Sequence, residues 1–164
     1  MWYQGHLDLD NQINFKQFEY TKKPLKQSQI DRWQKLGHEY KSFNGAMFAD
    51  QSCMPKQCYD IAKDLGFIQP GFTFYKMSTG EVMPDHVDHF DNYCKNFKVD
   101  RQYVYRAAVF LEDWKKGHYF EIDGCPIVNW KKGDYVVWSE EEFHTAANIG
   151  SEDRFTLQIT GQLA

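Results

Sequence analysis

The second half of the chain consists of short aromatic and β-branched segments separated by turn residues, and this pattern constrains the fold more than any other feature. Short segments of this composition between turn signals predict β-strands. About eight antiparallel strands with short connections form a jelly roll, two facing sheets whose mouth can hold a site. We expect these strands at residues 72–77, 83–89, 102–112, 118–123, 126–130, 135–139, 143–148 and 154–161, with residues 90–100 as a polar insert.

Two helices are expected before the strands, as a scaffold on one face of the sheet. The first begins with the S-x-x-D capping pattern of Ser28 and Asp31 and ends near Asn44-Gly45. The second runs from Pro55 to Leu65, with Gly66 as its stop. Residues 13–20 alternate in part, which is compatible with an outer strand. The apolar positions of the two helices are Ile30, Trp33, Leu36, Tyr40 and Phe43 in the first, and Cys58, Ile61 and Leu65 in the second.

A chain of 164 residues, 42% hydrophobic and 17% aromatic, is long enough for one folded domain with a core. We therefore expect a mainly β single domain over residues 1–164. In it, a supporting segment with two helices (1–66) precedes the strand-rich core (67–164). The net charge is −4 and there is no basic run, so we expect no nucleic-acid partner.

The expected cellular location rests on three sequence features that are missing. Its first residues show no basic-then-apolar leader, and no stretch approaches the roughly 20 apolar residues of a membrane span. The four cysteines form no C-x-x-C pair, which favours free thiols in a reducing compartment. We expect a cytoplasmic protein without a membrane partner. The sequence does not decide its oligomeric state.

The chemistry-bearing motif is His86-Val87-Asp88, with His144 further along the chain. Residues two apart on a strand point to the same side, so His86 and Asp88 can share one site. Two imidazoles and one carboxylate with open positions form the ligand set of non-haem Fe(II) oxygenases. Arg154 opens the strand after that of His144, and because a short turn joins the two strands we expect them to be neighbours about 4.8 Å apart.

A second H-x-D pair, His89 and Asp91, competes for the same role. We prefer the earlier pair, because Asp91 already lies in a loop-like stretch. His89 is three residues past His86, so it should point outward, and Asp85 is out of phase with Asp88.

At this point residues 67–161 resemble the Fe(II)- and 2-oxoglutarate-dependent dioxygenases, in particular the prolyl 4-hydroxylase-like branch with a double-stranded β-helix. The order and spacing of the motifs carry the resemblance together rather than one by one. The matching pieces are Tyr75, His86-Val87-Asp88, residues 108–114, 119–122 and 132–138, His144 and Arg154.

The resemblance implies a hydroxylase. His86, Asp88 and His144 would bind Fe(2+), and Arg154 would bind the far carboxylate of the co-substrate 2-oxoglutarate. Many prolyl hydroxylases have lysine where Arg154 stands. O2 would be consumed, 2-oxoglutarate would yield succinate and CO2, and an unactivated C–H bond would be hydroxylated. Ascorbate is a candidate reductant.

Further residues are assigned around this site. Tyr75 is expected beside the co-substrate, and Phe110 occupies a place where related enzymes have a tyrosine. Arg106 shares the face of Phe110 and Ala108 by the period of two, which makes it the alternative oxoglutarate anchor or a substrate contact. Other residues with assigned places are Thr156 and Gln158, which follow Arg154 with the same parity and are expected to line its pocket, and Trp138, which is expected to pack the barrel.

The substrate implied by the resemblance is a protein or peptide side chain, with peptidyl proline first. The same chemistry on a free amino acid or small metabolite is the alternative. A cupin-like protein that binds a metal without redox turnover is the rival from another class, and it would have no need of Arg154. A zinc hydrolase finds no support, because the chain has no H-E-x-x-H motif.

Overall fold

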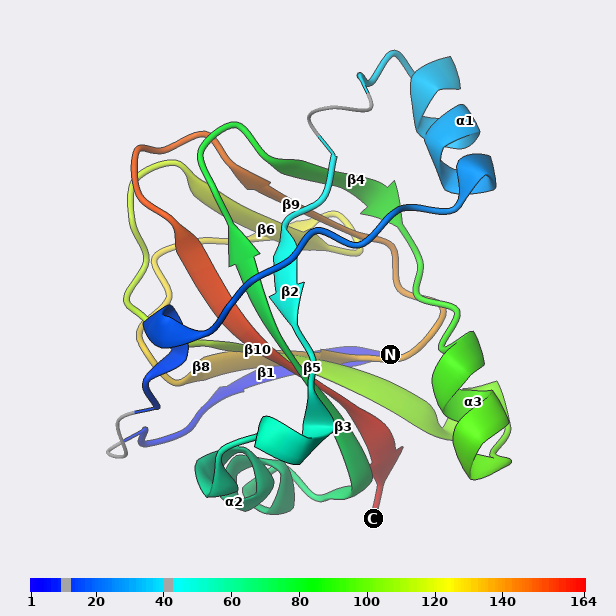
Figure 1. Cartoon of the computed structure of the whole chain (residues 1–164), viewed down its shortest axis with the longest axis vertical. Helices are drawn as coiled ribbons and strands as arrows, with labels where there is room; N and C mark the ends of the chain where they lie inside the picture. Colours follow the sequence, from blue (N-terminus) through cyan, green and yellow to red (C-terminus); the bar gives the residue numbers. More distant parts are fainter. Residues whose placement is uncertain (10–12, 40–42) are drawn as a thin grey trace.

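Two antiparallel sheets face each other in the computed structural model, which describes residues 1–9, 13–39 and 43–164 (Figure 1). The larger sheet has six strands in the order β1-β8-β5-β10-β3-β2, and the smaller has four in the order β4-β9-β6-β7. This arrangement is the expected jelly roll, a double-stranded β-helix. The strands are β1 (Trp2–His6), β2 (Ala46–Phe48), β3 (Phe67–Met77), β4 (Val82–His86), β5 (Val104–Phe110), β6 (His118–Ile122), β7 (Cys125–Ile127), β8 (Asp134–Trp138), β9 (His144–Asn148) and β10 (Arg154–Leu163).

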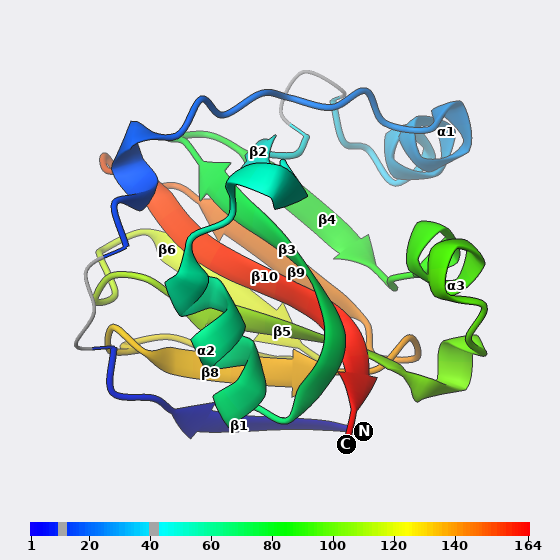
Figure 2. The same ribbon diagram turned by 60° about the horizontal axis from the view of Figure 1, so that its bottom comes forward.

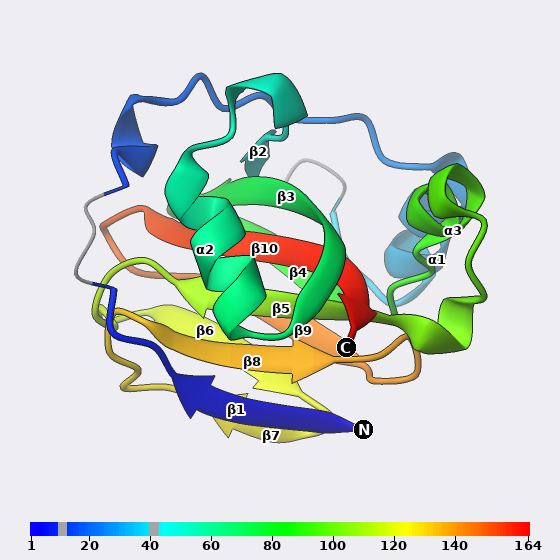
Figure 3. The same cartoon turned by 90° about the horizontal axis from the view of Figure 1, so that it is seen from below.

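Every strand expected from the sequence is present, and two further strands come from the N-terminal third. β1 pairs with β8 at one edge of the larger sheet (Figure 3), and β2 pairs with β3 at the other. The prediction of an outer strand at residues 13–20 is wrong. That stretch contains a 3-10 turn, Phe15–Gln17, and its aromatic side chains pack against the core instead of pairing in a sheet. Its partial alternation therefore reflects burial, not strand formation.

The second expected helix is confirmed and the first is shorter than expected. α2 (Lys56–Asp64) follows Pro55, and Gly66 ends it with a φ of 78°. α1 (Gln27–Lys35) begins after Lys26 rather than at Ser28. Gly37 takes a φ of 90°, which ends the helix early because few other residues adopt this conformation.

The residues expected on the apolar face of the first helix have four different outcomes. Ile30 and Trp33 are buried, whereas Leu36 is 64% exposed. Phe43 forms a β-bridge with Val82, beyond the helix. Tyr40 lies outside the described residues.

The expected polar insert at residues 90–100 contains a third helix, α3 (Asp91–Phe97), held by its buried Tyr93. The three helices lie at different places: α2 covers the outer face of the larger sheet, while α1 and α3 lie at one end of the two sheets (Figure 2). No helix of the described part is both long and apolar enough to cross a membrane.

Strand alternation gives the larger sheet two different buried faces. On β3, Phe72 and Phe74 point toward α2, whereas Tyr75 and Met77 point toward the smaller sheet. β5 and β10 follow the same period. One face is thus a largely apolar layer under α2, and the other is free to carry polar groups in the space between the sheets.

The outer layer should dominate stability. Phe74 is fully buried there. We expect Phe74→Ala to lower the free energy of unfolding by about 3–5 kcal/mol, because the substitution removes buried surface and leaves a cavity. Urea denaturation measures this, with Tyr103→Ala, at a position 58% exposed, as the control. A loss below about 1 kcal/mol for Phe74→Ala would show that this layer is not a packed core.

Candidate metal centre

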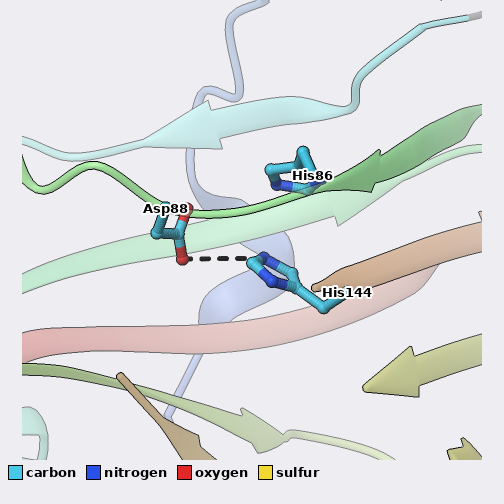
Figure 4. Close-up of side chains that lie close together, drawn as sticks. All are labelled: His86, Asp88 and His144. Carbon is cyan, nitrogen blue, oxygen red and sulfur yellow. Dashed lines mark ion pairs between the residues drawn. The ribbon is translucent and has the colours of Figure 1, made fainter. Parts of the chain in front are cut away.

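Two histidines and one aspartate converge between the sheets (Figure 4). His86 ends β4 and His144 begins β9, and the two are register partners with ring centroids 4.2 Å apart. Asp88 follows β4, and its Oδ2 lies 3.5 Å from Nε2 of His144. One ligand atom from each residue lies within 4.8 Å of the other two. This set could hold a metal ion.

A β-bulge decides which β4 residue faces His144. Met83 is opposite Ala146, but His86 is opposite His144, so β4 carries one residue more than β9 between these pairs. Without the extra residue, Asp85 would face His144. Asp85 is instead exposed. Asp88 lies just beyond the strand, so the extended chain after the bulge, rather than a regular strand, brings it to the site.

The alternative H-x-D pair does not contribute to this centre. His89 is exposed, as its parity predicted. Asp91 begins α3 and pairs with Arg101 at 2.8 Å. The earlier pair is therefore the one that meets His144.

Backbone carbonyls orient both imidazoles. Nδ1 of His86 lies 2.7 Å from the carbonyl oxygen of Pro84, and Nδ1 of His144 lies 3.1 Å from that of Glu142. Because a carbonyl only accepts, Nδ1 must carry the proton in each ring. Nε2 is then left unprotonated, with the lone pair that a metal requires.

Burial keeps the two histidines neutral. It lowers the pKa of His86 to about 4, with further lowering by His144, and it also lowers the pKa of His144. For Asp88, burial acts to raise the pKa, but the charge of Arg106, with the hydrogen bond from Trp138, outweighs it and the pKa is lowered. Two neutral imidazoles and an ionised carboxylate are the protonation states in which these groups bind metals.

Each oxygen of Asp88 has its own donor. Nη1 of Arg106 donates to Oδ1 at 2.8 Å, and Nε1 of Trp138 donates to Oδ2 at 3.0 Å. Trp138 was expected only to pack; it is 1% exposed and it also orients Asp88. Its position directly opposite Arg106 in the β5–β8 register would have revealed this, but strand pairing is not visible in the sequence.

Arg154 lies on the opposite sheet, which corrects an expectation. β9 and β10 are not neighbours: β9 pairs with β4 and β6, whereas β10 pairs with β3 and β5. The short connection crosses from one sheet to the other, as jelly-roll connections do. Arg154 therefore points into the space between the sheets from the larger sheet, not along the strand next to His144.

The guanidinium of Arg154 is buried without a counter-charge. The residue is 5% exposed, its Nε has no hydrogen-bond partner, its Nη1 reaches only the sulfur of Met77 at 3.9 Å, and no carboxylate of the described residues forms an ion pair with it. Burial lowers its pKa to about 10. The rings of Phe110, Phe120 and Trp130 lie 5.6–5.8 Å from its guanidinium carbon. Rings stabilise such a cation only in part, so the site is suited to an anion.

Tyr75 lies near Arg154 and is held by the N-terminal third of the chain. Its hydroxyl donates to the side-chain oxygen of Asn44 and accepts from the backbone N–H of Gly45 at 2.8 Å. Burial raises the pKa of Tyr75 to about 12. Asn44 was expected only at the end of a helix. Nothing in its sequence neighbourhood indicated a role beside β3.

These groups share one cavity of about 970 Å³. The triad and Arg154 lie in its inner part, together with the wall formed by Tyr75. The cavity extends outward to α1 and α3. Its lining also includes the residues assigned by parity, Arg106, Ala108, Thr156 and Gln158, while Phe110 forms part of the apolar core beside it.

Compared by sequence, the chain matches no protein-family model and no curated protein. Compared by structure, it is similar to a prolyl-4-hydroxylase from Pseudomonas putida, with a TM-score of 0.57 and 17% identity over 99% of this chain and 92% of that one. Two further similar structures score lower. They are a predicted oxalate decarboxylase from Thermotoga maritima (TM-score 0.44, 16% identity, 72% and 80% covered) and a protein with a double-stranded β-helix domain from Klebsiella pneumoniae (TM-score 0.40, 12% identity, 57% and 67% covered).

At these identities the similarity to the Pseudomonas enzyme shows the fold alone. The chain therefore has the double-stranded β-helix fold with a group of residues that could hold a metal.

Removing a ligand should weaken metal binding strongly. We expect His86→Ala, Asp88→Ala and His144→Ala each to weaken Mn²⁺ or Zn²⁺ binding by at least about 100-fold, since loss of an orienting partner alone costs 10–100-fold. Titration calorimetry measures the affinities. His89→Ala is the matched control and should bind as the unaltered protein does. Equal affinities for His86→Ala and His89→Ala would place the metal elsewhere.

The metal-free protein should lose stability in mild acid. An unfolded histidine titrates near pH 6.5, whereas folded His86 resists protonation down to about pH 4. Below pH 6.5 the unfolded state therefore binds more protons, and stability falls as the pH falls toward 4, by roughly 3 kcal/mol for His86.

Thermal unfolding of the metal-free protein between pH 7.5 and 4.5 tests this. His86→Gln should flatten the profile, whereas His89→Gln should leave it unchanged. A profile that His86→Gln does not alter would contradict the assignment.

Proposed function

We propose that the protein is an Fe(II)- and 2-oxoglutarate-dependent dioxygenase that hydroxylates an unactivated C–H bond. The observation that carries the proposal is the buried guanidinium of Arg154, which has no counter-charge among the described residues and shares a cavity with the two histidines and the aspartate. A charge kept in the interior without a partner is costly, so a ligand that supplies the missing anion would bind there strongly.

The residues fit both groups that this chemistry requires. His86, Asp88 and His144 would hold the iron, with two neutral imidazoles and one ionised carboxylate. Arg154 offers a planar pair of donors to the far carboxylate of 2-oxoglutarate. When bound, iron with 2-oxoglutarate and O2 supplies the oxidising power, and 2-oxoglutarate is converted to succinate and CO2.

The chain's own residues bind, orient and exclude water. Trp138 and Arg106 hold the two oxygens of Asp88, which limits the rotation of the carboxylate. Phe110, which stands where related enzymes often have a tyrosine, contributes a ring instead of a hydroxyl, and Trp130 stacks on it with centroids 4.0 Å apart. This dry wall beside Arg154 strengthens its attraction for an anion.

The same observation disfavours the two rivals. A cupin-like protein that only binds a metal gains nothing from an unpaired buried arginine, whose burial is unfavourable. A zinc hydrolase needs a free carboxylate as general base. The described residues that line the cavity offer Asp88, which belongs to the triad, and Asp91, which pairs with Arg101.

The substrate that the resemblance implies is peptidyl proline, and a free amino acid or small metabolite is the alternative. The cavity volume of about 970 Å³ does not choose between them by size. Succinate formation with Fe(II) tests the reaction, and its stimulation by a proline-containing peptide or by single amino acids tests the substrate.

Arg154 should set the affinity for 2-oxoglutarate. Charge-assisted hydrogen bonds contribute about 1.5–3 kcal/mol, so Arg154→Ala should raise the KM for 2-oxoglutarate roughly 10- to 150-fold. Succinate formation measures the KM, and calorimetry with Mn²⁺ should show an unchanged metal affinity.

Arg32→Ala, at an exposed arginine of α1, is the matched control. Unaltered 2-oxoglutarate dependence in Arg154→Ala would overturn the assignment of the anchor. Loss of metal binding in that variant would instead point to a disturbed fold.

A further inference from the structure

A second arginine lines the same cavity beside the metal ligands. Arg106 donates from Nη1 to Asp88 at 2.8 Å and from Nε to Thr160 at 3.2 Å, while the ring of Phe90 lies 5.2 Å from its guanidinium carbon. Its Nη2 makes no hydrogen bond to any residue that the structure describes. The side chain is 25% exposed, so this free edge is open to the cavity.

The charges of the cavity lining do not balance. Lys26, Arg106 and Arg154 bring three positive charges, and Asp88 and Asp91 bring two negative ones, so the described lining carries +1. Lys26 and Asp91 lie 3.6 Å apart at the outer end, where Asp91 also pairs with Arg101 at 2.8 Å, so Asp91 adds no negative charge near Arg106 and Arg154. The excess therefore belongs to the inner part, where Arg106 and Arg154 face a single carboxylate.

Loading the site with metal and co-substrate leaves the excess in place. A divalent ion bound to the triad raises the charge from +1 to +3, and dianionic 2-oxoglutarate at Arg154 returns it to +1. Asp88 would then share its negative charge with the metal, which is the largest local charge in such a site. Arg106 would lose most of its counter-charge just as the site becomes ready for substrate.

We propose that Arg106 binds the carboxylate of the primary substrate, and that this substrate is a free carboxylic acid, such as an amino acid, rather than an internal residue of a peptide. The inference rests on the proposed function and selects between its two substrate classes. An internal peptide residue without an acidic side chain brings no charge to neutralise Arg106. A carboxylate on Nη2 would fix its neighbouring carbon atoms beside the metal ligands.

Arg106 is the group to observe directly, because the chain has only four arginines: Arg32, Arg101, Arg106 and Arg154. We would load the protein with Zn²⁺, which is redox-inert, saturate it with 2-oxoglutarate, and record the ¹⁵N-NMR signals of the arginine Nε–H groups. Loss of a signal in Arg106→Lys assigns Arg106. Titrations with acetate and with acetamide, of nearly equal shape, then separate charge from size at constant ionic strength.

The expected result is a saturable shift of the Arg106 signal with acetate and none with acetamide. The Arg32 signal should not saturate with either probe, because Arg32 is exposed on α1. A signal of Arg106 that ignores acetate, or that responds equally to acetamide, overturns the proposal. Failure of the proposed function would give a different result, because the Arg154 signal would then not move when 2-oxoglutarate is added.

Two larger probes distinguish the sources of the carboxylate. L-proline and glycylglycyl-L-proline each carry one, and each is compared with its C-terminal amide. We expect L-proline to bind at least tenfold more tightly than L-prolinamide, and Arg106→Gln but not Arg106→Lys to remove the difference. Tighter binding of the peptide acid than of L-proline would overturn the choice of a free acid and assign Arg106 to a peptide C-terminus.

Discussion

Alternation along β3, β5 and β10 is the constraint on which the rest of the structure depends. Successive side chains of a strand point to opposite faces, so each of these strands serves two layers. One face is apolar and packs under α2, with Phe74 and Leu157 fully buried. This layer supplies the hydrophobic stabilisation. The opposite face can then carry Arg154, whose burial is unfavourable, and the half-buried Arg106.

The candidate site joins side chains from both sheets across the space between them. His86 and His144 come from paired strands of the smaller sheet, while Arg154 and Arg106 come from the larger one. The bulge in β4 places His86 opposite His144, and two hydrogen bonds orient the carboxylate of Asp88. The excess of positive charge follows from this arrangement, since two guanidiniums face one carboxylate in a region of low dielectric. Because positive charge is in excess there, an anion would be bound favourably near the two arginines.

Much of the fold could be predicted because local patterns report local structure. The strand segments of the second half carry period-two alternation and turn residues, and α2 carries Pro55 and Gly66 at its ends. The structure of the N-terminal third was harder to predict from the sequence. β1 and β2 are short edge strands, and they are stabilised by pairing with β8 and β3. The partial alternation of residues 13–20 places aromatic rings against the core. Parity correctly placed Arg106, Thr156 and Gln158 in the cavity lining, but strand pairing put β10 on the sheet opposite β9.

The sequence by itself determined which residues alternate, where the chain turns, and that two imidazoles, a carboxylate and an arginine are spaced as metal and anion ligands would be. These properties depend on neighbours along the chain. The tertiary structure alone decided that Arg154 lies across from His144, that Trp138 and Arg106 hold Asp88, and that Asn44 reaches Tyr75. These contacts join residues far apart in the sequence, and their energies arise from burial and strand pairing, which no local pattern records.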